Sequence, residues 1–121
     1  MKYIFLTKKF YDDYKNCPEI EKKQDRPYMQ ACIEIDSKIY AVPLRSHITH
    51  EHVLWSDKEN CCGLDFSKAV LLLKPDEYID KERSPYIRPK EFKALKGKEY
   101  EAEQKLKKYI KQYKKLNQNY N

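Results

Sequence analysis

The side chains best suited to chemistry flank a β-hairpin that the sequence predicts. Arg26 precedes the first strand of this hairpin, and Arg45, Ser46 and His47 lie at the end of the second. In an antiparallel pair, the start of one strand lies beside the end of the next. We therefore expect Arg26 and Ser46 to be neighbours in space, although they are twenty positions apart in the chain.

These residue types fit the metal-free cleavage of an RNA phosphodiester. In that reaction the ribose 2′-OH attacks the adjacent phosphate, so one group must remove its proton and another must protonate the leaving 5′-oxygen. An arginine matches two phosphate oxygens and can stabilise the added negative charge. A serine hydroxyl can orient the same oxygens, and a histidine titrates near neutrality and can move protons. Which residue acts as acid and which as base stays open, as do the ordinary alternatives of a turn serine at Ser46 and a surface ion pair between Arg26 and Asp25.

The histidines and cysteines do not form a metal-binding pattern. The three histidines, His47, His50 and His52, are gathered within six positions, and two of them would share a face of a strand. A metal site needs a third ligand at suitable spacing, and none is evident. Adjacent cysteines at 61 and 62 do not have the C-x-x-C spacing of a zinc site. We expect neither a metal nor an organic cofactor.

The elements that must position these residues can be read from hydrophobic patterning. We expect strands over residues 3–6, 29–35 and 38–44, another over 63–64 and then 69–73, and a short edge strand over 77–79, with the apolar run 69–73 at the centre of the sheet. Residues 45–60 read as a polar loop around a short apolar stretch. Helices are expected over residues 8–16 and from residue 89 onward, with Gly97 as a weak point. This order predicts one α+β domain spanning residues 1–121, with an antiparallel sheet.

The positive charge of the chain is concentrated in its last third. The formal net charge is +6, and residues 88–121 contain 11 basic and 4 acidic residues, a net charge of +7. Apolar residues at three- and four-residue steps make this stretch a Lys-rich amphipathic helix, whose apolar stripe should pack on the sheet. Its lysines suit sequence-independent contacts with a nucleic-acid backbone; the candidates are Lys105, Lys108, Lys111 and Lys115. Tyr28 and Trp55 are candidates for stacking on bases.

Targeting signals are not evident in the sequence. The first residues lack the long apolar stretch of a signal peptide, and no segment approaches the roughly 18 apolar residues that cross a bilayer. We therefore expect a cytoplasmic protein whose cysteine thiols are reduced.

Three segments resemble motifs of the ToxN/AbiQ family of type III toxin–antitoxin endoribonucleases. Residues 40–46 resemble the family's Tyr-x-x-Pro-Leu-(Thr/Ser)-Ser-Pro-Lys element, and residues 26–28 resemble its Lys/Arg-Pro-Phe/Tyr element. Residues 62–66, followed by the apolar run 69–73, resemble its Gly-x-Ile-Asn/Asp strand entry. In this alignment Ser46 matches the family's essential serine and Arg26 its conserved basic residue.

The resemblance implies a fold, an activity and a partner. The fold would be a strongly twisted antiparallel sheet flanked by helices, similar to that of MazF/Kid toxins. The activity would be sequence-selective, metal-independent RNA cleavage that leaves a 2′,3′-cyclic phosphate. The natural inhibitor would be a small repeat RNA folded as a pseudoknot, which the toxin also processes. Protein and RNA would close into a cyclic assembly with more than one protein copy, and the biological setting would be phage defence.

The chain departs from the family pattern on both sides of the serine. Arg45 stands where the family often has Thr or Ser, and His47 stands where it often has Pro before a lysine. Arg45 or His47 could supply the missing charge or proton transfer. Two other functions are compatible with the same composition: a non-catalytic RNA-binding module, which would not need Ser46, and a protein-interaction domain whose Lys-rich helix binds an acidic protein.

Overall fold

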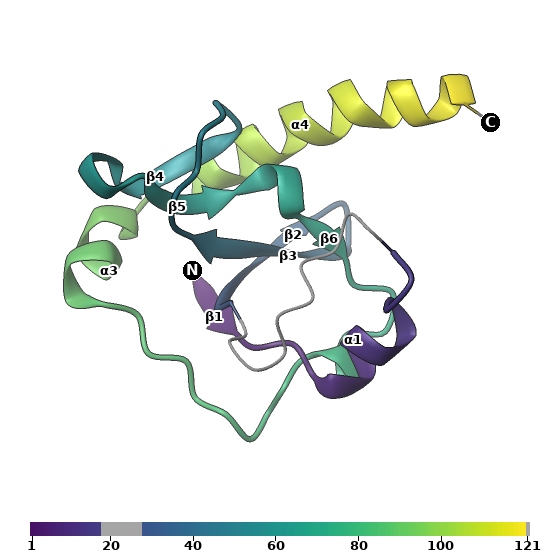
Figure 1. Ribbon diagram of the computed structural model, residues 1–121, viewed down its shortest axis with the longest axis horizontal. Helices are drawn as coiled ribbons and strands as arrows, with labels where there is room; N and C mark the ends of the chain where they lie inside the picture. The colour runs from purple at the N-terminus through teal and green to yellow at the C-terminus, as the bar shows by residue number, and fades with distance from the viewer. Residues whose placement is uncertain (18–27, 121) are drawn as a thin grey trace.

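The computed structural model describes residues 1–17 and 28–120, with side chains described as far as residue 113. It is an α+β structure built on a six-stranded antiparallel sheet that does not close into a barrel (Figure 1). The main strand order is β1-β2-β3-β5-β4, and β6 pairs with β3 beside β5. The predicted class is therefore confirmed.

A hairpin of β2 (Gln30–Ile35) and β3 (Lys38–Arg45) is the centre of the sheet. Its two turn residues have positive φ angles, 51° at Asp36 and 66° at Ser37. Two consecutive positive φ angles match the right-handed twist of the flanking strands. The predicted hairpin and its turn are confirmed, and the hairpin ends at Arg45, immediately before Ser46.

The strands around this hairpin differ from the prediction. β1 (Lys2–Ile4) pairs with β2, as an amino-terminal strand should. The expected polar loop at 45–60 was wrong in part, because β4 (Val53–Asp57) and a 3₁₀ turn lie within it. β5 (Cys62–Asp65) lies between β3 and β4.

The apolar run 69–73 is not a central strand. Only β6 (Val70–Leu71) pairs with β3, opposite Ala41 and Tyr40, and it lies off the main strand path. Leu72 instead packs into the core beneath α1, and Leu73 is exposed. The predicted edge strand at 77–79 is mostly α2 (Pro75–Tyr78), and only Ile79 makes an isolated bridge, to Leu6.

The helices cover both faces of the sheet. Along β3, Val42 faces the core beneath the carboxy-terminal helices, and Ala41 faces a second core beneath α1 (Lys8–Asp13) and α2. Thr7 caps α1 by accepting a hydrogen bond from the Phe10 amide at 3.3 Å. The helix ends at residue 13, three residues earlier than expected. Figure 1 shows α4 along one side of the sheet and α1 on the other.

Gly97 divides the carboxy-terminal helical region, as predicted. Its φ of +78° is one that other residues rarely adopt, and it separates α3 (Pro89–Leu95) from α4 (Glu99–Tyr120). Ala102 and Leu106 of α4 are fully buried in the core, so the amphipathic stripe packs on the sheet. No helix in the described part of the chain, α4 included, has both the length and the apolar composition needed to cross a membrane.

Candidate functional site

Ser46 lies at the edge of a hollow of about 340 Å³ beside the end of β3. The Ser46 side chain is exposed, and its hydroxyl has no hydrogen-bond partner among the described residues. The other residues that line this hollow include two arginines, a carboxylate and two tyrosines: Arg45, Arg88, Glu91, Tyr28 and Tyr86. We call this cavity the Ser46 hollow. His47 is exposed, has a φ of 57° and does not line it.

Arg45 is held in the Ser46 hollow by a buried carboxylate. Its Nη1 donates to Oδ2 of Asp65 at 2.7 Å, and Asp65 is fully buried on β5. Gly63, opposite Arg45 in the β3–β5 ladder, lies two residues before Asp65, so the three positions share one face of the sheet. The ring centroid of Tyr28 lies 5.5 Å from the Arg45 guanidinium carbon. These contacts fix a side chain that would otherwise be flexible.

Asp65 is the centre of a larger hydrogen-bonded network. Its Oδ1 accepts from the Ser67 hydroxyl at 2.5 Å and from the Ser67 amide at 3.0 Å, and it lies 3.0 Å from Nε2 of His50. Burial raises the pKa of the Asp65 carboxyl, but the hydrogen bonds from Ser67 and Arg45 and the nearby imidazole of His50 outweigh it, so the pKa is lowered. Asp65 is therefore a stable anion that anchors Arg45.

The network contains Ser, His and Asp, yet it is not arranged as a nucleophilic triad. The His52 amide donates to Nδ1 of His50 at 3.0 Å, which leaves the imidazole proton of the neutral ring on Nε2. That nitrogen lies 3.1 Å from the Ser67 hydroxyl, and the hydroxyl donates to Asp65. In this arrangement His50 cannot take the proton of Ser67, because the nitrogen that faces the hydroxyl already carries one.

Arg88 is held in the Ser46 hollow in the same manner. Its Nε donates to Oε1 of Glu91 at 2.6 Å, and the Glu91 side chain is only 5% exposed. The hydroxyl of Ser56 on β4 donates to the other oxygen of Glu91 at 2.5 Å. The Glu91 carboxylate raises the pKa of Arg88 further above its ordinary value, so this guanidinium is always charged.

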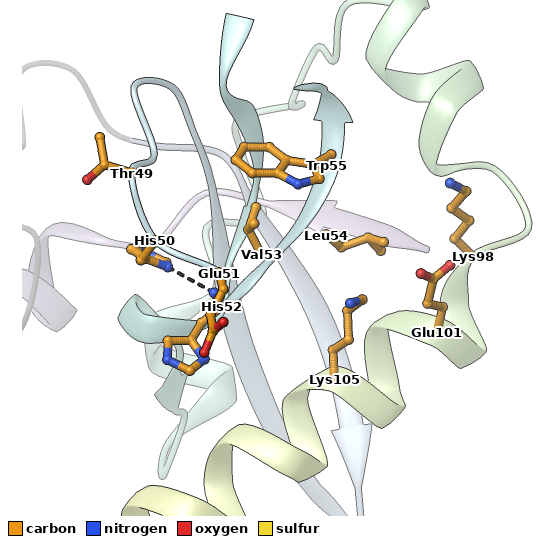
Figure 2. A pocket seen from close by; sticks show the side chains of 10 residues that line it. All are labelled: Thr49, His50, Glu51, His52, Val53, Leu54, Trp55, Lys98, Glu101 and Lys105. Carbon is orange, nitrogen blue, oxygen red and sulfur yellow. Dashed lines mark hydrogen bonds between the residues drawn. The ribbon is translucent and has the colours of Figure 1, made fainter. Parts of the chain in front are cut away.

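A wider groove runs between the segment 49–55 and the start of α4 (Figure 2). It encloses about 780 Å³, and a second hollow of about 240 Å³ shares four of its lining residues and continues it along α4. We call the two together the basic groove. Figure 2 shows Trp55 on one wall and Lys98 and Lys105 on the other, and Lys108 lines the continuation.

His52 lies in the floor of the basic groove against α4. Its Nε2 is 3.3 Å from the hydroxyl of Tyr113, and the rings of Tyr109 and Tyr113 pack edge-on against it. The two tyrosine rings stack with their centroids 4.3 Å apart. The lining of the basic groove combines an imidazole, an indole and lysine ammonium groups, which suit phosphates and bases, with two carboxylates, Glu51 and Glu101.

The structure brings some of the predicted site residues together and separates others. Tyr28, Arg45 and Ser46 share the Ser46 hollow, and Trp55, Lys105 and Lys108 share the basic groove. Lys111 lines a different hollow, near the β2–β3 turn. Arg26 and the side chain of Lys115 lie outside the described residues, so the expected proximity of Arg26 and Ser46 stays a prediction.

Several residues of these sites were missed by the sequence analysis. Glu91 and Arg88 carry no recognisable motif. Asp65 was noted only as the acidic position of the Gly-x-Ile-Asn/Asp resemblance, although a charged residue at the end of an apolar strand is itself a signal of a paired buried charge. His50 and His52 were noted only as a weak metal pair. Within the described ranges, no group of three or more His, Cys, Asp or Glu side chains is placed to hold a metal ion.

Comparison of the chain with protein-family models, with curated proteins and with solved structures finds no match.

Proposed function

We propose that this chain is a metal-independent endoribonuclease that cuts RNA by attack of the ribose 2′-OH, leaving a 2′,3′-cyclic phosphate. The observation that carries the proposal is the Ser46 hollow, in which an exposed serine hydroxyl lies with two anchored arginines and two tyrosines. In the proposed reaction Arg45 and the Ser46 hydroxyl contact the non-bridging oxygens of the scissile phosphate, and Tyr28 packs against a neighbouring base.

The role of Arg45 follows from the charge that develops during cleavage. The pentacoordinate phosphorane carries more negative charge than the starting diester, so a fixed cation stabilises it preferentially. Asp65 holds the Arg45 guanidinium before substrate arrives, and little reorganisation is then needed during the reaction. Arg45 thus supplies the positive charge that the family pattern provides with a lysine two positions after the serine.

The basic groove gives the proposal a route for the rest of the RNA strand. Lys105 and Lys108 are spaced along one face of α4 and can contact successive phosphates, while Trp55 on the opposite wall can stack on a base. Stacking on one aromatic ring contributes about 1–3 kcal/mol per base and tolerates every base. Sequence selectivity would then arise in the Ser46 hollow.

The wider biological proposal rests on the motif resemblance together with this geometry. The protein would act in the cytoplasm as the toxin of a type III toxin–antitoxin system, with a twisted sheet similar to that of MazF/Kid toxins. A small pseudoknotted repeat RNA would inhibit it and be processed by it, within a cyclic assembly containing more than one protein copy. Phage defence would be the setting.

The decisive experiment is RNA cleavage in excess chelator. Purified protein, freed of co-purified RNA, is incubated with a defined RNA, and the fragment ends are analysed. We expect cyclic-phosphate ends from wild type and a loss of at least roughly a hundredfold in rate for Ser46→Ala, the usual effect of removing one donor to a developing oxyanion. Ser84→Ala, at an exposed loop position outside the hollow, should cut as wild type does.

Other outcomes favour the rival functions. A wild-type protein that binds RNA but leaves it intact would be a non-catalytic RNA-binding module. The basic groove is the structural feature that favours this second function. A protein with little affinity for RNA, or a complex that is insensitive to salt, would instead indicate a protein partner, because binding to RNA phosphates weakens steeply as salt rises.

A further inference from the structure

We propose that Arg88 forms, with Arg45, a two-armed clamp for a single phosphodiester beside Ser46. Each guanidinium of the clamp is anchored by its own buried carboxylate, Glu91 for Arg88 and Asp65 for Arg45. The identity of the ligand as RNA rests on the proposed function. The clamp itself rests on the geometry of α3, β3 and β5.

The anchor of Arg88 is unusual for a pair three residues apart on a helix. In such pairs both side chains are ordinarily exposed, and the pair contributes little to stability. Here the Glu91 side chain is 5% exposed and the Arg88 side chain is 66% exposed. The carboxylate therefore lies inside the protein and the guanidinium faces outward, into the Ser46 hollow.

The cost of burying Glu91 indicates that more than helix stability is involved. A buried carboxylate is unfavourable unless it is both paired and hydrogen-bonded. Ser56 on β4 and Arg88 at the start of α3 together provide this, so two elements hold one side chain. An apolar residue at position 91 would pack in the same place without that cost, but it would leave Arg88 unanchored.

The two arginines approach the Ser46 hollow from opposite faces of the sheet. Nη2 of Arg88 lies 3.8 Å from Sγ of Cys62, whose side chain lies on the face of β5 opposite to that of Gly63 and its cross-strand partner Arg45. The hollow lies at the end of β3, and both arginines line it together with Ser46.

The donor geometry suits an anion between the arginines. A guanidinium has five N–H donors in a plane. Glu91 engages Nε and Nη2 of Arg88, and Nη2 also donates to Sγ of Cys62. The two N–H donors of Nη1 have no partner among the described residues and are available for phosphate oxygens. Because Asp65 and Glu91 balance both charges within the fold, the two arginines can lie close without strong repulsion. The exposed ring of Tyr86 then lies beside the clamp, where an adjacent base can pack.

Binding to an RNA that cannot be cut tests the clamp separately from catalysis. The probe is an oligonucleotide with a 2′-deoxy substitution at the cleaved nucleotide, or throughout if wild type does not cut. We expect Arg88→Ala to weaken binding roughly ten- to hundredfold, the effect of losing one or two charge-assisted contacts. The slope of log K against log salt should fall by about 0.7, the value for one phosphate contact with a single strand.

Three further variants separate the clamp from a structural role. Arg88→Lys keeps the charge but lacks the planar donor pair, so it should recover the salt slope while regaining only part of the affinity. Glu91→Gln should weaken binding while leaving Arg88 charged. Lys93→Ala removes an exposed charge from the same helix and should leave binding unchanged. Thermal unfolding of each variant checks that the fold is retained.

The outcomes of this experiment are distinct from those of the cleavage test. If Arg88→Ala binds the probe with wild-type affinity and an unchanged salt slope, the clamp is wrong, whether or not the protein cuts RNA. If wild type does not cut but Arg88→Ala still loses affinity and slope, the clamp stands and the endoribonuclease proposal fails. Equal losses in Arg88→Ala and Lys93→Ala would show a general charge effect and overturn the clamp.

Discussion

Replacing Asp65 with asparagine removes one charge from the centre of the network while keeping the shape of the side chain. The Asp65 carboxylate is fully buried and receives hydrogen bonds from Arg45 at 2.7 Å and from Ser67 at 2.5 and 3.0 Å. An asparagine oxygen can still accept from Ser67. The ion pair with Arg45 is lost, and the arginine is left with a neutral amide opposite it.

The expected loss of stability follows from how deeply this pair is buried. Breaking a fully buried ion pair by removing one partner costs about 3–5 kcal/mol. The Arg45 side chain is 23% exposed, so water can replace part of what it loses. We therefore expect Asp65→Asn to lower the free energy of unfolding at pH 7 by about 2–3 kcal/mol. In a chain of this size that corresponds to a decrease of roughly 8–12 °C in Tm.

The same substitution has a defined pH dependence. The pKa of Asp65 is lower in the folded protein than its ordinary value of 3.8. The unfolded chain therefore binds this proton at a higher pH than the folded chain does, and the stabilising contribution is complete above the unfolded pKa. It decreases as the pH falls through the folded pKa. The difference in stability between wild type and Asp65→Asn should thus be largest near neutrality and shrink below about pH 4.

Urea unfolding of both proteins between pH 7 and pH 3 measures this difference directly. Three other carboxyl groups, Asp13, Asp57 and Glu99, also have lowered pKa values, but they are present in both proteins and cancel in the difference. Asp76→Asn, at a fully exposed side chain, should change stability by less than about 0.5 kcal/mol. A loss that stays constant across the pH range, or a variant as stable as wild type, would refute the proposed anchoring role of Asp65.

Two further predictions concern the sheet and the basic groove. Gly63→Ala should destabilise the protein by about 1–3 kcal/mol in urea unfolding, because the added Cβ would lie 2.4 Å from the backbone oxygen of Leu54 and would force β4 away; wild-type stability would contradict this close approach. Replacing both Lys105 and Lys108 with alanine should lower the slope of log K against log salt for RNA binding by about 1.4, the value for two phosphate contacts with a single strand. The matched double variant, Lys107→Ala with Lys111→Ala, should leave that slope unchanged, and an equal loss in both would show that the groove is not the binding surface.

The sequence was sufficient for the parts of the fold in which local signals and tertiary packing agree. The hairpin at 30–45 combines alternating apolar residues with a short polar turn, and the helix break at Gly97 is set by backbone conformation alone. The prediction for residues 69–73 was wrong for a different reason. Five apolar residues in a row are typical of a buried strand, but only Val70 and Leu71 pair with β3, while Leu72 packs beneath α1 and Leu73 is exposed. How far a strand continues along its partner depends on packing with distant segments, which is not encoded locally.

The strand β4 was missed because its apolar stretch, Val53 to Trp55, is only three residues long and is followed by the polar Ser56 and Asp57. Ser56 is nevertheless buried, because it has a partner thirty-five residues later in the chain, the Glu91 carboxylate. Position in the chain gave no hint of this pair. The same limit applies to Asp65 and Arg45, which are twenty residues apart and belong to strands whose pairing could not be predicted.

The network around Asp65 explains how an arginine can be held in a fixed position beside Ser46. A free arginine at the end of β3 would sample many rotamers, and ordering it at the moment of binding would cost conformational entropy. The buried carboxylate removes that cost before a ligand arrives, since it fixes the guanidinium from within the fold. Hydrogen bonds from Ser67 and from Arg45 itself, with His50 nearby, keep the pKa of the Asp65 carboxyl low despite its burial. The proposed role of Arg45 therefore depends on three residues from different segments, Asp65, Ser67 and His50. A substitution at any of them should change how Arg45 is held in the Ser46 hollow, although none of the three lines that hollow.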